Sequence, residues 1–283
     1  MNKRLSYQAG EFPRTLSLQI RLDDDPRYKG SIHDDAVARA RGYKAALVPG
    51  AFIYGHISRV AVEAWGRDWA ERGGMGARFR RPVYNGDTLR IFATNLSGGP
   101  EMRRASISVV NEDDEEVATG WVGLPDSPGS PPSFSDFRII PRPEVPPEIS
   151  PGALRPGLPV TTADRILSET EFRASLRAFG EHHPVYAEPA FVHSGCLMRI
   201  AMGDTNNSFR FPAPIVLVSV EARHFARVRP GQRLATVGRI TGTSLRKGKY
   251  YFESEEVVTA NGTPVAHFAR SSIYAYEPDR ESS

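Results

Sequence analysis

His33 is the residue whose type and neighbours best suit acid–base chemistry in this sequence. An unperturbed imidazole changes its charge close to neutral pH, so it can take and return a proton during a reaction. Two carboxylates follow it, Asp34 and Asp35, and either could orient the ring. Asp35 could equally cap a short helix that carries Ala40. The alternative for His33 is a structural role in a half of the chain that does not catalyse.

A second group of polar residues runs from Glu181 to His193. Glu181 is followed directly by His182 and His183. Glu181 could act as a general base with one of these imidazoles beside it. The alternative is a polar loop that leads into Pro184. The histidines lack the spacing of metal ligands on a helix, so we expect no metal site here.

Two glycines begin the helices that must position these groups. The segment from Gly50 to Trp65 has helical spacing in its apolar residues Ile53, Ile57, Val60, Ala61 and Ala64. A second helix is predicted from Gly195, with Leu197, Ile200 and Ala201 on one face. His56 lies in the first helix, where it either lines a pocket or belongs to the polar face.

The chain is an imperfect repeat with a proline-rich segment at its centre. Four landmarks recur at an offset of 145 residues, namely Gly50 and Gly195, Val83 and Val228, Gly86 and Gly231, and Leu89 and Leu234. Eleven of the 23 prolines lie from Pro125 to Pro159, and proline at that density favours an extended surface linker. We therefore predict an N-terminal half (1–124), a linker (125–160) and a C-terminal half (161–283).

Both halves become rich in strands after their helix. Related strand-turn-strand segments are predicted over 79–89 and 225–234, and alternating residues continue the first half as strands around Ile91 and Ile107. In the second half, residues 215–220, 234–240, 250–258 and 265–276 are typical of strands separated by turns. One helix followed by an antiparallel meander, repeated twice, predicts an α+β fold whose sheet wraps the apolar helices.

The composition excludes several classes of protein. Lys and Arg exceed Asp and Glu by only 36 to 33, without the long basic run that nucleic-acid or membrane-surface binding favours. No apolar run is long enough to span a bilayer, and the N-terminus lacks the pattern of a signal peptide. The single cysteine, Cys196, fits a reducing compartment. We expect a cytoplasmic protein.

The segment from Ile166 to Tyr186 resembles the start of the MaoC-like hot-dog hydratases. In that family a short helix leads to the motif Gly-Asp-x-Asn-Pro-x-His, whose Asp and His are the catalytic pair. In the first half, the residues around His33, Gly42-Tyr43 and Leu47-Val-Pro-Gly50 are similar to those that follow that histidine. The resemblance covers nearly the whole chain outside the linker. It implies a double hot-dog fold, with one antiparallel sheet wrapping two helices.

Neither half keeps the complete catalytic pair of that family. In the second half Glu181 takes the aspartate position and Tyr186 the histidine position. In the first half His33 keeps the histidine position, while Tyr28 takes the aspartate position. A tyrosine can donate a proton but is a poor base, because its pKa is ordinarily near 10. The catalytic candidates are therefore Tyr28, His33, Glu181 and Tyr186. Either His33 and Glu181 meet in one site, or they belong to two separate sites.

The resemblance also implies the chemistry. Hydration of an enoyl thioester needs a base to activate water, an acid to protonate the α-carbon, and donors for the thioester oxygen. In the family these donors are backbone N–H groups where the hot-dog helix begins, which assigns Gly50 and Gly195. Tight turns are the alternative for both glycines. His56 and His193 are the further candidates for binding substrate.

We therefore expect a lyase that adds water to, or removes it from, an acyl thioester. The substrate would carry CoA or a carrier-protein arm in a tunnel between the halves, no cofactor would be needed, and a homodimer is expected. One alternative is another reaction in the same pocket, such as thioester hydrolysis, elimination or cyclisation. The other is a non-catalytic protein that binds an acyl ligand or supports a partner subunit.

Overall fold

The first half begins with an edge strand and a long helix. The computed structural model describes residues 12–22, 25–99, 101–162, 164–187 and 191–277. The elements of the first half are β1 (Arg14–Gln19), α1 (Asp35–Ala40), α2 (Gly50–Arg72), β2 (Gly74–Phe79), β3 (Thr88–Ala93), β4 (Arg103–Val110) and β5 (Glu116–Leu124). Short 3-10 turns cover Pro26–Tyr28, Phe134–Asp136 and Pro184–Tyr186.

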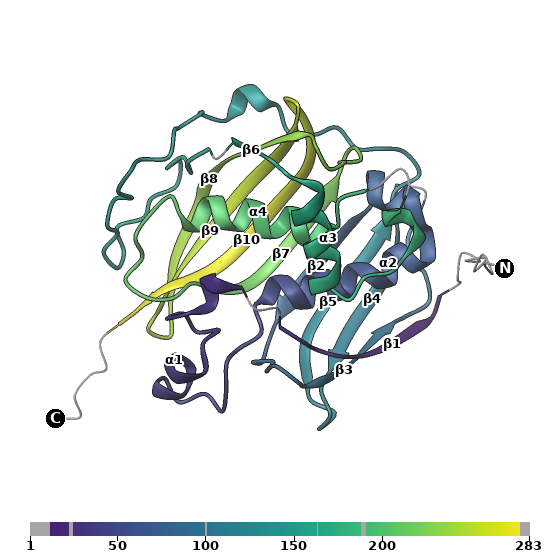
Figure 1. Cartoon of the computed structure of the whole chain (residues 1–283), viewed down its shortest axis with the longest axis horizontal. Helices are drawn as coiled ribbons and strands as arrows, with labels where there is room; N and C mark the ends of the chain where they lie inside the picture. Colours follow the sequence, from purple (N-terminus) through teal and green to yellow (C-terminus); the bar gives the residue numbers. More distant parts are fainter. Residues whose placement is uncertain (1–11, 23–24, 100, 163, 188–190, 278–283) are drawn as a thin grey trace.

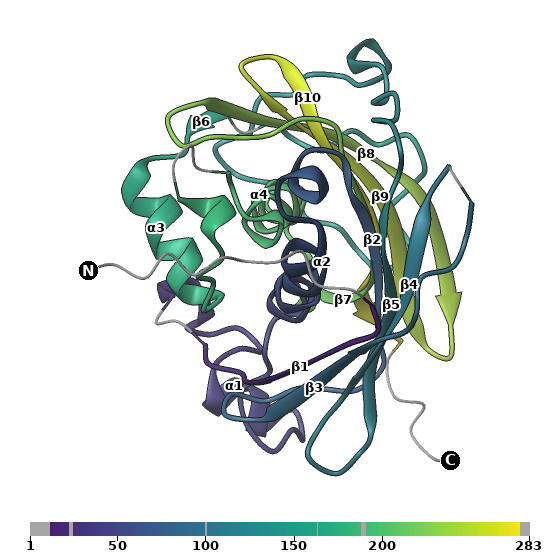
Figure 2. The ribbon, with the colours of Figure 1, turned by 90° about the vertical axis from the view of Figure 1, so that its right-hand side faces the viewer.

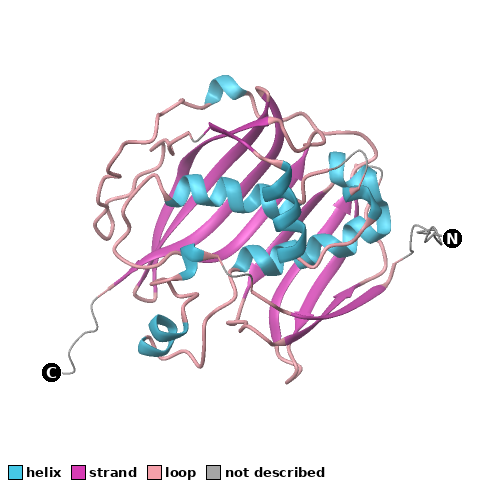
Figure 3. Cartoon of the chain, in the orientation of Figure 1, coloured by secondary structure: helices cyan, strands magenta, loops and turns pink. Residues whose placement is uncertain are grey.

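The second half repeats this plan with one further helix. Its elements are β6 (Asp164–Ile166), α3 (Glu169–Ala178), α4 (Ser194–Asn206), β7 (Val216–His224), β8 (Arg233–Arg246), β9 (Lys249–Ala260) and β10 (Thr263–Tyr276). Helix α3 begins at a capping box, in which Ser168 and Glu171 satisfy each other's backbone N–H groups. Figure 3 shows α2, α3 and α4 in front of the sheet, with α1 beside its lower edge.

All ten strands form one antiparallel sheet in the order β1-β3-β4-β5-β2-β7-β10-β9-β8-β6 (Figure 1). The two halves join at β2 and β7, where Gly76 pairs with Glu221. These two residues are 145 apart, so each is the repeat equivalent of the other and the join is symmetric. The predicted α+β fold, with one continuous sheet built from two similar halves, is confirmed.

The sheet curves around α2 and α4, which lie side by side on its concave face (Figure 2). Their apolar side chains fill the core, with Phe52, Ile57 and Leu197 buried. Helix α2 extends beyond the predicted Trp65 to Arg72, because the chain passes a non-helical residue at Gly66 and then resumes the helix. Removing these side chains from water is the main stabilisation of the fold.

The predicted strand-turn-strand segments are crossovers and not hairpins. Strands β2 and β3 are separated in the sheet by β4 and β5, and β7 and β8 are separated by β9 and β10. The predicted turns at Gly86 and Gly231 are present, and both glycines adopt a positive φ. Which strands pair is decided by burial of the helices and not by the turn, so sequence spacing alone did not reveal it.

The proline-rich segment packs against the second half. Its Leu154 and Val160 are buried in a cluster with Phe252 and Tyr274, and its Phe137 packs on β8 and β9. The domain boundaries at 124 and 160 stay a prediction. Within the described residues, every helix is too short or too polar to cross a membrane.

The concave face differs between the halves. Beneath α2 it is apolar, with the buried residues Ile91, Ala105, Ile107 and Val122. The strand register shows that four buried polar residues of the second half take the equivalent positions: Thr236, Ser254, Glu256 and Arg270. The Arg270 guanidinium donates to the Glu256 carboxylate (Nε to Oε2, 3.1 Å), and Thr205 of α4 donates to the same carboxylate at 2.7 Å. These bonds offset the desolvation of the buried pair.

Candidate active site

A cavity of about 360 Å³ lies where α2 begins, and we call it the α2 cavity. Both halves line it. The first half contributes His33, Gly50 and Ile53, and the second half contributes Leu217 and Tyr251. Its walls are mainly apolar, and the three cations Arg80, Arg81 and Lys249 also line it. An apolar cavity with few polar groups, placed between two halves, is typical of small-molecule sites.

His33 presents a lone pair to this cavity. Its Nδ1 lies 2.7 Å from the carbonyl oxygen of Leu47. A carbonyl only accepts, so Nδ1 carries the proton and Nε2 is left as the basic nitrogen. Burial lowers the pKa of His33 below its ordinary 6.5, which keeps the ring neutral at pH 7. The ring is therefore ready to accept a proton.

The neighbouring carboxylates are engaged elsewhere. Asp34 caps α1 by accepting from the N–H of Ala36 at 2.9 Å, the role that the sequence suggested for Asp35. Asp35 accepts from the N–H of Ala46 at 2.6 Å. In the part of the chain that the structure describes, His33 has no carboxylate as a hydrogen-bond partner. The Leu47 carbonyl orients it, a partner with no side-chain signal in the sequence.

Tyr28 and the upstream aspartates complete the surroundings of His33. The Tyr28 ring meets the His33 ring edge-on, with centroids 5.5 Å apart. Asp25 binds Arg199 of α4 at 2.8 Å. Asp23 and Asp24, the next acidic residues towards the N-terminus, lie outside the described residues. Tyr28 thus packs beside His33. Its phenol cannot supply the carboxylate that aspartate would provide at position 28.

The N-terminus of α2 leaves hydrogen-bond donors for a ligand. The capping position holds Pro49, and no side chain caps the helix. The first N–H groups of a helix lack intrahelical partners, and the helix dipole makes this end positive. Gly50 lines the cavity at this point, where a Cβ would come within 3.2 Å of Leu217 and Phe79. A developing oxyanion can be stabilised there.

The equivalent position in the second half is filled. His193 caps α4, with its Nδ1 accepting the N–H of Gly195 at 3.0 Å. The Phe179 ring stacks on His193 with centroids 4.3 Å apart. A Cβ on Gly195 would come within 2.6 Å of that ring. Phe179 therefore occupies the space beside Gly195. The N–H of Gly195 already donates to His193.

Glu181 belongs to this second, buried group and not to the site of His33. Its Oε1 accepts the N–H groups of His182 and His183, each at 2.8 Å. Its Oε2 lies 3.9 Å from Nε2 of His193, and neither atom has a hydrogen-bond partner in the part of the chain that the structure describes. Burial raises the pKa of Glu181 and lowers the pKa of His193 to about 3. His33 and Glu181, the two residues that the resemblance placed at catalytic positions, thus lie in separate clusters.

Tyr186 is also buried in the second group. Its ring centroid lies 5.4 Å from that of His193, and burial raises the pKa of its hydroxyl well above 10. A cavity of only about 10 Å³ adjoins it, lined also by Ser194 and His224. That volume is about one water molecule. No acyl chain fits there without rearrangement.

A buried polar network that joins α2, α4 and β7 has no signal in the sequence. The Ser194 hydroxyl lies 2.7 Å from the Tyr54 hydroxyl and 2.8 Å from Nε2 of His224. These residues are far apart in sequence, and no spacing pattern connects them. His56, predicted to bind substrate, lines a different cavity from that of His33. Among the described residues, no group of three His, Cys, Asp or Glu side chains is placed to hold a metal ion.

Known proteins resemble this chain in structure. The sequence matches no protein-family model and no curated protein. A structure described as a MaoC domain protein dehydratase from Chloroflexus aurantiacus has a TM-score of 0.63 at 15% identity, covering 95% of this chain and 97% of that one. A conserved hypothetical protein from Mycobacterium tuberculosis with a double hotdog fold has a TM-score of 0.62 at 14% identity, covering 94% and 97%.

Thioesterases share the fold as well. A structure described as an oleoyl thioesterase from Lactobacillus plantarum has a TM-score of 0.52 at 11% identity, covering 96% of this chain and 99% of that one. The chain therefore has the double hot-dog fold seen in MaoC-like dehydratase structures. One fold can support several reactions, so the reaction must be argued from the site.

Proposed function

We propose that this protein hydrates an enoyl thioester, or dehydrates a 3-hydroxyacyl thioester, in the α2 cavity. One observation carries the proposal: a neutral His33 and the uncapped N-terminus of α2 face the same apolar cavity. The first is a base and the second a set of oxyanion donors. A non-catalytic protein would be favoured if side chains blocked the N-termini of both α2 and α4. Only the N-terminus of α4 is blocked, which argues against the non-catalytic alternative.

In the hydration direction, Nε2 of His33 takes a proton from water as the water oxygen bonds to the β-carbon. The electron pair of the double bond moves towards the thioester, whose oxygen gains enolate charge. The N–H groups at the start of α2 stabilise that charge. The protonated His33 then returns its proton to the α-carbon, which restores the neutral imidazole. One residue can thus serve as base and acid in turn.

The cations lining the cavity suit a phosphorylated carrier. Arg80 pairs with Glu116 at 3.0 Å and Arg81 with Glu115 at 3.1 Å. Lys249 has no carboxylate partner among the described residues, so its charge is available to a phosphate of CoA or of a carrier-protein arm. A homodimer and a cytoplasmic location stay predictions.

Thioester hydrolysis is the second candidate. His33 has no carboxylate to assist it in the described structure, and a single base that activates one water is enough to attack a thioester carbonyl. The same N–H groups would stabilise the resulting oxyanion. The two reactions differ in the carbon attacked and in the product.

Turnover assays test both candidates. Crotonyl-CoA and longer enoyl-CoA substrates are followed by loss of enoyl absorbance, and saturated acyl-CoA substrates by release of free thiol. We expect loss of the enoyl group without thiol release. Thiol release from saturated substrates would show that the protein is a thioesterase and not a hydratase. Inactivity across all chain lengths in both assays would exclude both proposed reactions.

A further inference from the structure

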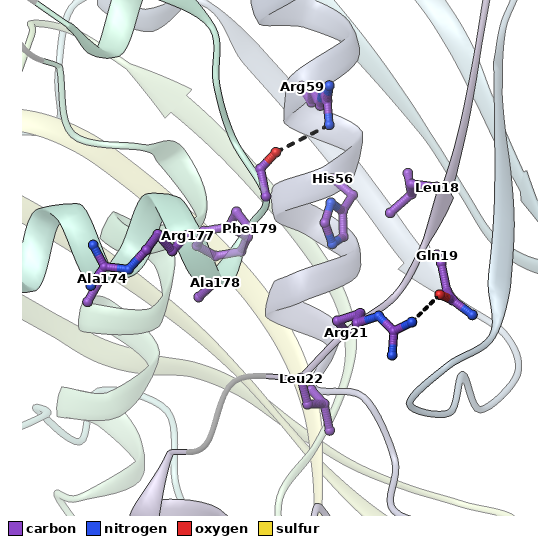
Figure 4. A pocket seen from close by; sticks show the side chains of 11 residues that line it. Leu18, Gln19, Arg21, Leu22, His56, Arg59, Ala174, Arg177, Ala178 and Phe179 are labelled. Carbon is purple, nitrogen blue, oxygen red and sulfur yellow. Dashed lines mark hydrogen bonds between the residues drawn. The ribbon is translucent and has the colours of Figure 1, made fainter.

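A second cavity, of about 810 Å³, is lined by α3, α2 and β1, and we call it the α3 pocket (Figure 4). It shares no lining residue with the α2 cavity. Its walls come from three elements distant in sequence: Leu18 and Gln19 of β1, His56 of α2 and Ala178 of α3. A volume of this size accommodates a small organic molecule.

The walls of the α3 pocket combine apolar surface with positive charge. Leu18, Leu22 and Phe179 supply apolar area. Arg21, Arg59 and Arg177 supply cations, and the lining includes no carboxylate. A concave surface with charges of one sign attracts ligands of the opposite sign.

Two of these arginines keep their charge uncompensated. Arg59 donates to Glu63 at 3.0 Å, so its charge is largely neutralised. Arg21 donates to the amide oxygen of Gln19, which is uncharged. Within the described residues, neither Arg21 nor Arg177 pairs with a carboxylate. Both side chains are exposed and able to reorient towards an anion.

His56 gives the pocket a polar group that lacks a partner. Figure 4 shows its ring projecting from α2 between Phe179 and Leu18. The residue is only 6% exposed, and among the described residues neither ring nitrogen has a hydrogen-bond partner. Burial lowers the pKa of His56 to about 4, so the neutral ring offers one N–H and one lone pair. A buried polar group left unpaired is destabilising, and a ligand that bonds to it removes that penalty.

The floor of the pocket is held rigidly in place. The Phe179 ring packs against the backbone of both central helices, since a Cβ on Gly55 would come within 2.3 Å of it and one on Gly195 within 2.6 Å. His193 stacks on it from α4. A preorganised wall lowers the entropic cost of binding.

We propose that the α3 pocket binds an organic carboxylate with an apolar chain. The chain lies on Leu18, Leu22 and Phe179. The carboxylate is held by Arg21 and Arg177 and accepts the N–H of His56. The site is separate from the α2 cavity and binds its ligand whether or not the α2 cavity turns over a thioester.

Calorimetric titration with octanoate tests the proposal, with 1-octanol as the neutral probe of equal chain length and octyl phosphate as the second anion. We expect octanoate to bind at least tenfold more tightly than 1-octanol. The double substitution R21Q/R177Q should weaken octanoate about tenfold and leave 1-octanol unchanged. Tighter binding of octyl phosphate than of octanoate would overturn the carboxylate assignment.

His56→Leu separates binding from folding. Leucine removes an unpaired buried polar group, so the variant should unfold at or above the temperature of the parent while octanoate binding weakens. Ile53→Trp, which narrows only the α2 cavity, is the matched control and should leave octanoate binding intact. The proposal fails if octanoate affinity is unchanged in R21Q/R177Q and His56→Leu, or if Ile53→Trp alone abolishes binding.

Discussion

The N-termini of α2 and α4 occupy equivalent places in the two halves but present opposite surfaces. That of α2 has no side-chain cap and adjoins a cavity of about 360 Å³ containing His33. That of α4 is capped by His193 and blocked by Phe179, and the cavity near it holds about 10 Å³. A repeated fold therefore supplies two possible sites, and side chains decide which one admits a ligand.

Most of the buried polar side chains lie in the second half, where the helix N-terminus is blocked. The neutral imidazoles of His193 and His224, together with Glu181, lie around the blocked end of α4. The concave face of the second half also contains the Glu256–Arg270 pair, where the first half is apolar. The first half has an apolar concave face beneath α2, and its His33 lines the α2 cavity. The second half buries several polar side chains away from any large cavity.

The largest expected effect separates His33 from Glu181. His33→Gln should lower kcat/KM by about 10²- to 10⁴-fold, because the general base is lost. Glu181→Gln should leave kcat/KM within a fewfold of the parent, since Glu181 lies outside the α2 cavity. Both are measured with the thioester that the parent turns over, with unfolding temperature as a check on folding. Equal losses in the two variants would place both halves in one site.

The buried imidazoles predict an acid-sensitive fold. The folded pKa values of His56, His193 and His224 lie near 4, 3 and 4, below the ordinary 6.5, so only the unfolded chain takes up these protons as the pH falls below 6.5. Three protons correspond to about 4 kcal/mol of stability lost per pH unit, and the raised pKa of Glu181 offsets a part. Stability should be nearly constant between pH 7 and about 8 and should fall at more alkaline pH. Burial raises the pKa values of the Cys196 thiol and the Tyr54 and Tyr186 hydroxyls, so the unfolded chain loses these protons first.

Urea unfolding at a series of pH values measures this slope. His56→Leu should reduce it by about a third, because one of the three imidazoles is removed. His33→Gln should change it less, because His33 is only half-buried. A slope that does not respond to His56→Leu would contradict the assignment of the acid sensitivity to these residues.

The two glycines should respond differently to alanine. Gly195→Ala should lower stability by about 1–3 kcal/mol, because the new Cβ overlaps the Phe179 ring and the Cα of Gly55. Gly50→Ala should cost less stability, since its Cβ meets only side-chain atoms at 3.2 Å, yet it should lower kcat/KM. Chemical denaturation and turnover measured on both variants give the comparison. If Gly195→Ala lost more activity per folded molecule than Gly50→Ala, the oxyanion site would belong at the start of α4 and not of α2.

The smallest effect is the pH dependence of the parent's activity. A base must be neutral to accept a proton, so kcat/KM should rise with pH and reach a plateau. The midpoint should lie below 6.5, because burial lowers the pKa of His33. A pH profile with its midpoint above 6.5 would instead indicate a carboxylate close to the ring.

Much of the architecture followed from sequence patterns. Helical spacing from Gly50 and the 145-residue offset gave two similar halves, because burial of an apolar face imposes its period on the chain. The offset even matches the residues at the join, Gly76 and Glu221. Strand order did not follow, because the turns at Gly86 and Gly231 show where a strand ends and not which strand it meets.

The sequence by itself determined the residue types of the candidate site: His33, the glycines at the two helix starts, and in each half one departure from the Asp and His pair of the family that it resembles. Only the tertiary structure decided that His33 and Glu181 lie apart, that the Leu47 carbonyl orients the base, and that Phe179 blocks Gly195. The reason is physical. Residue type and spacing fix what a side chain can do locally, whereas cavity volume, burial and partners depend on contacts between segments far apart in the chain.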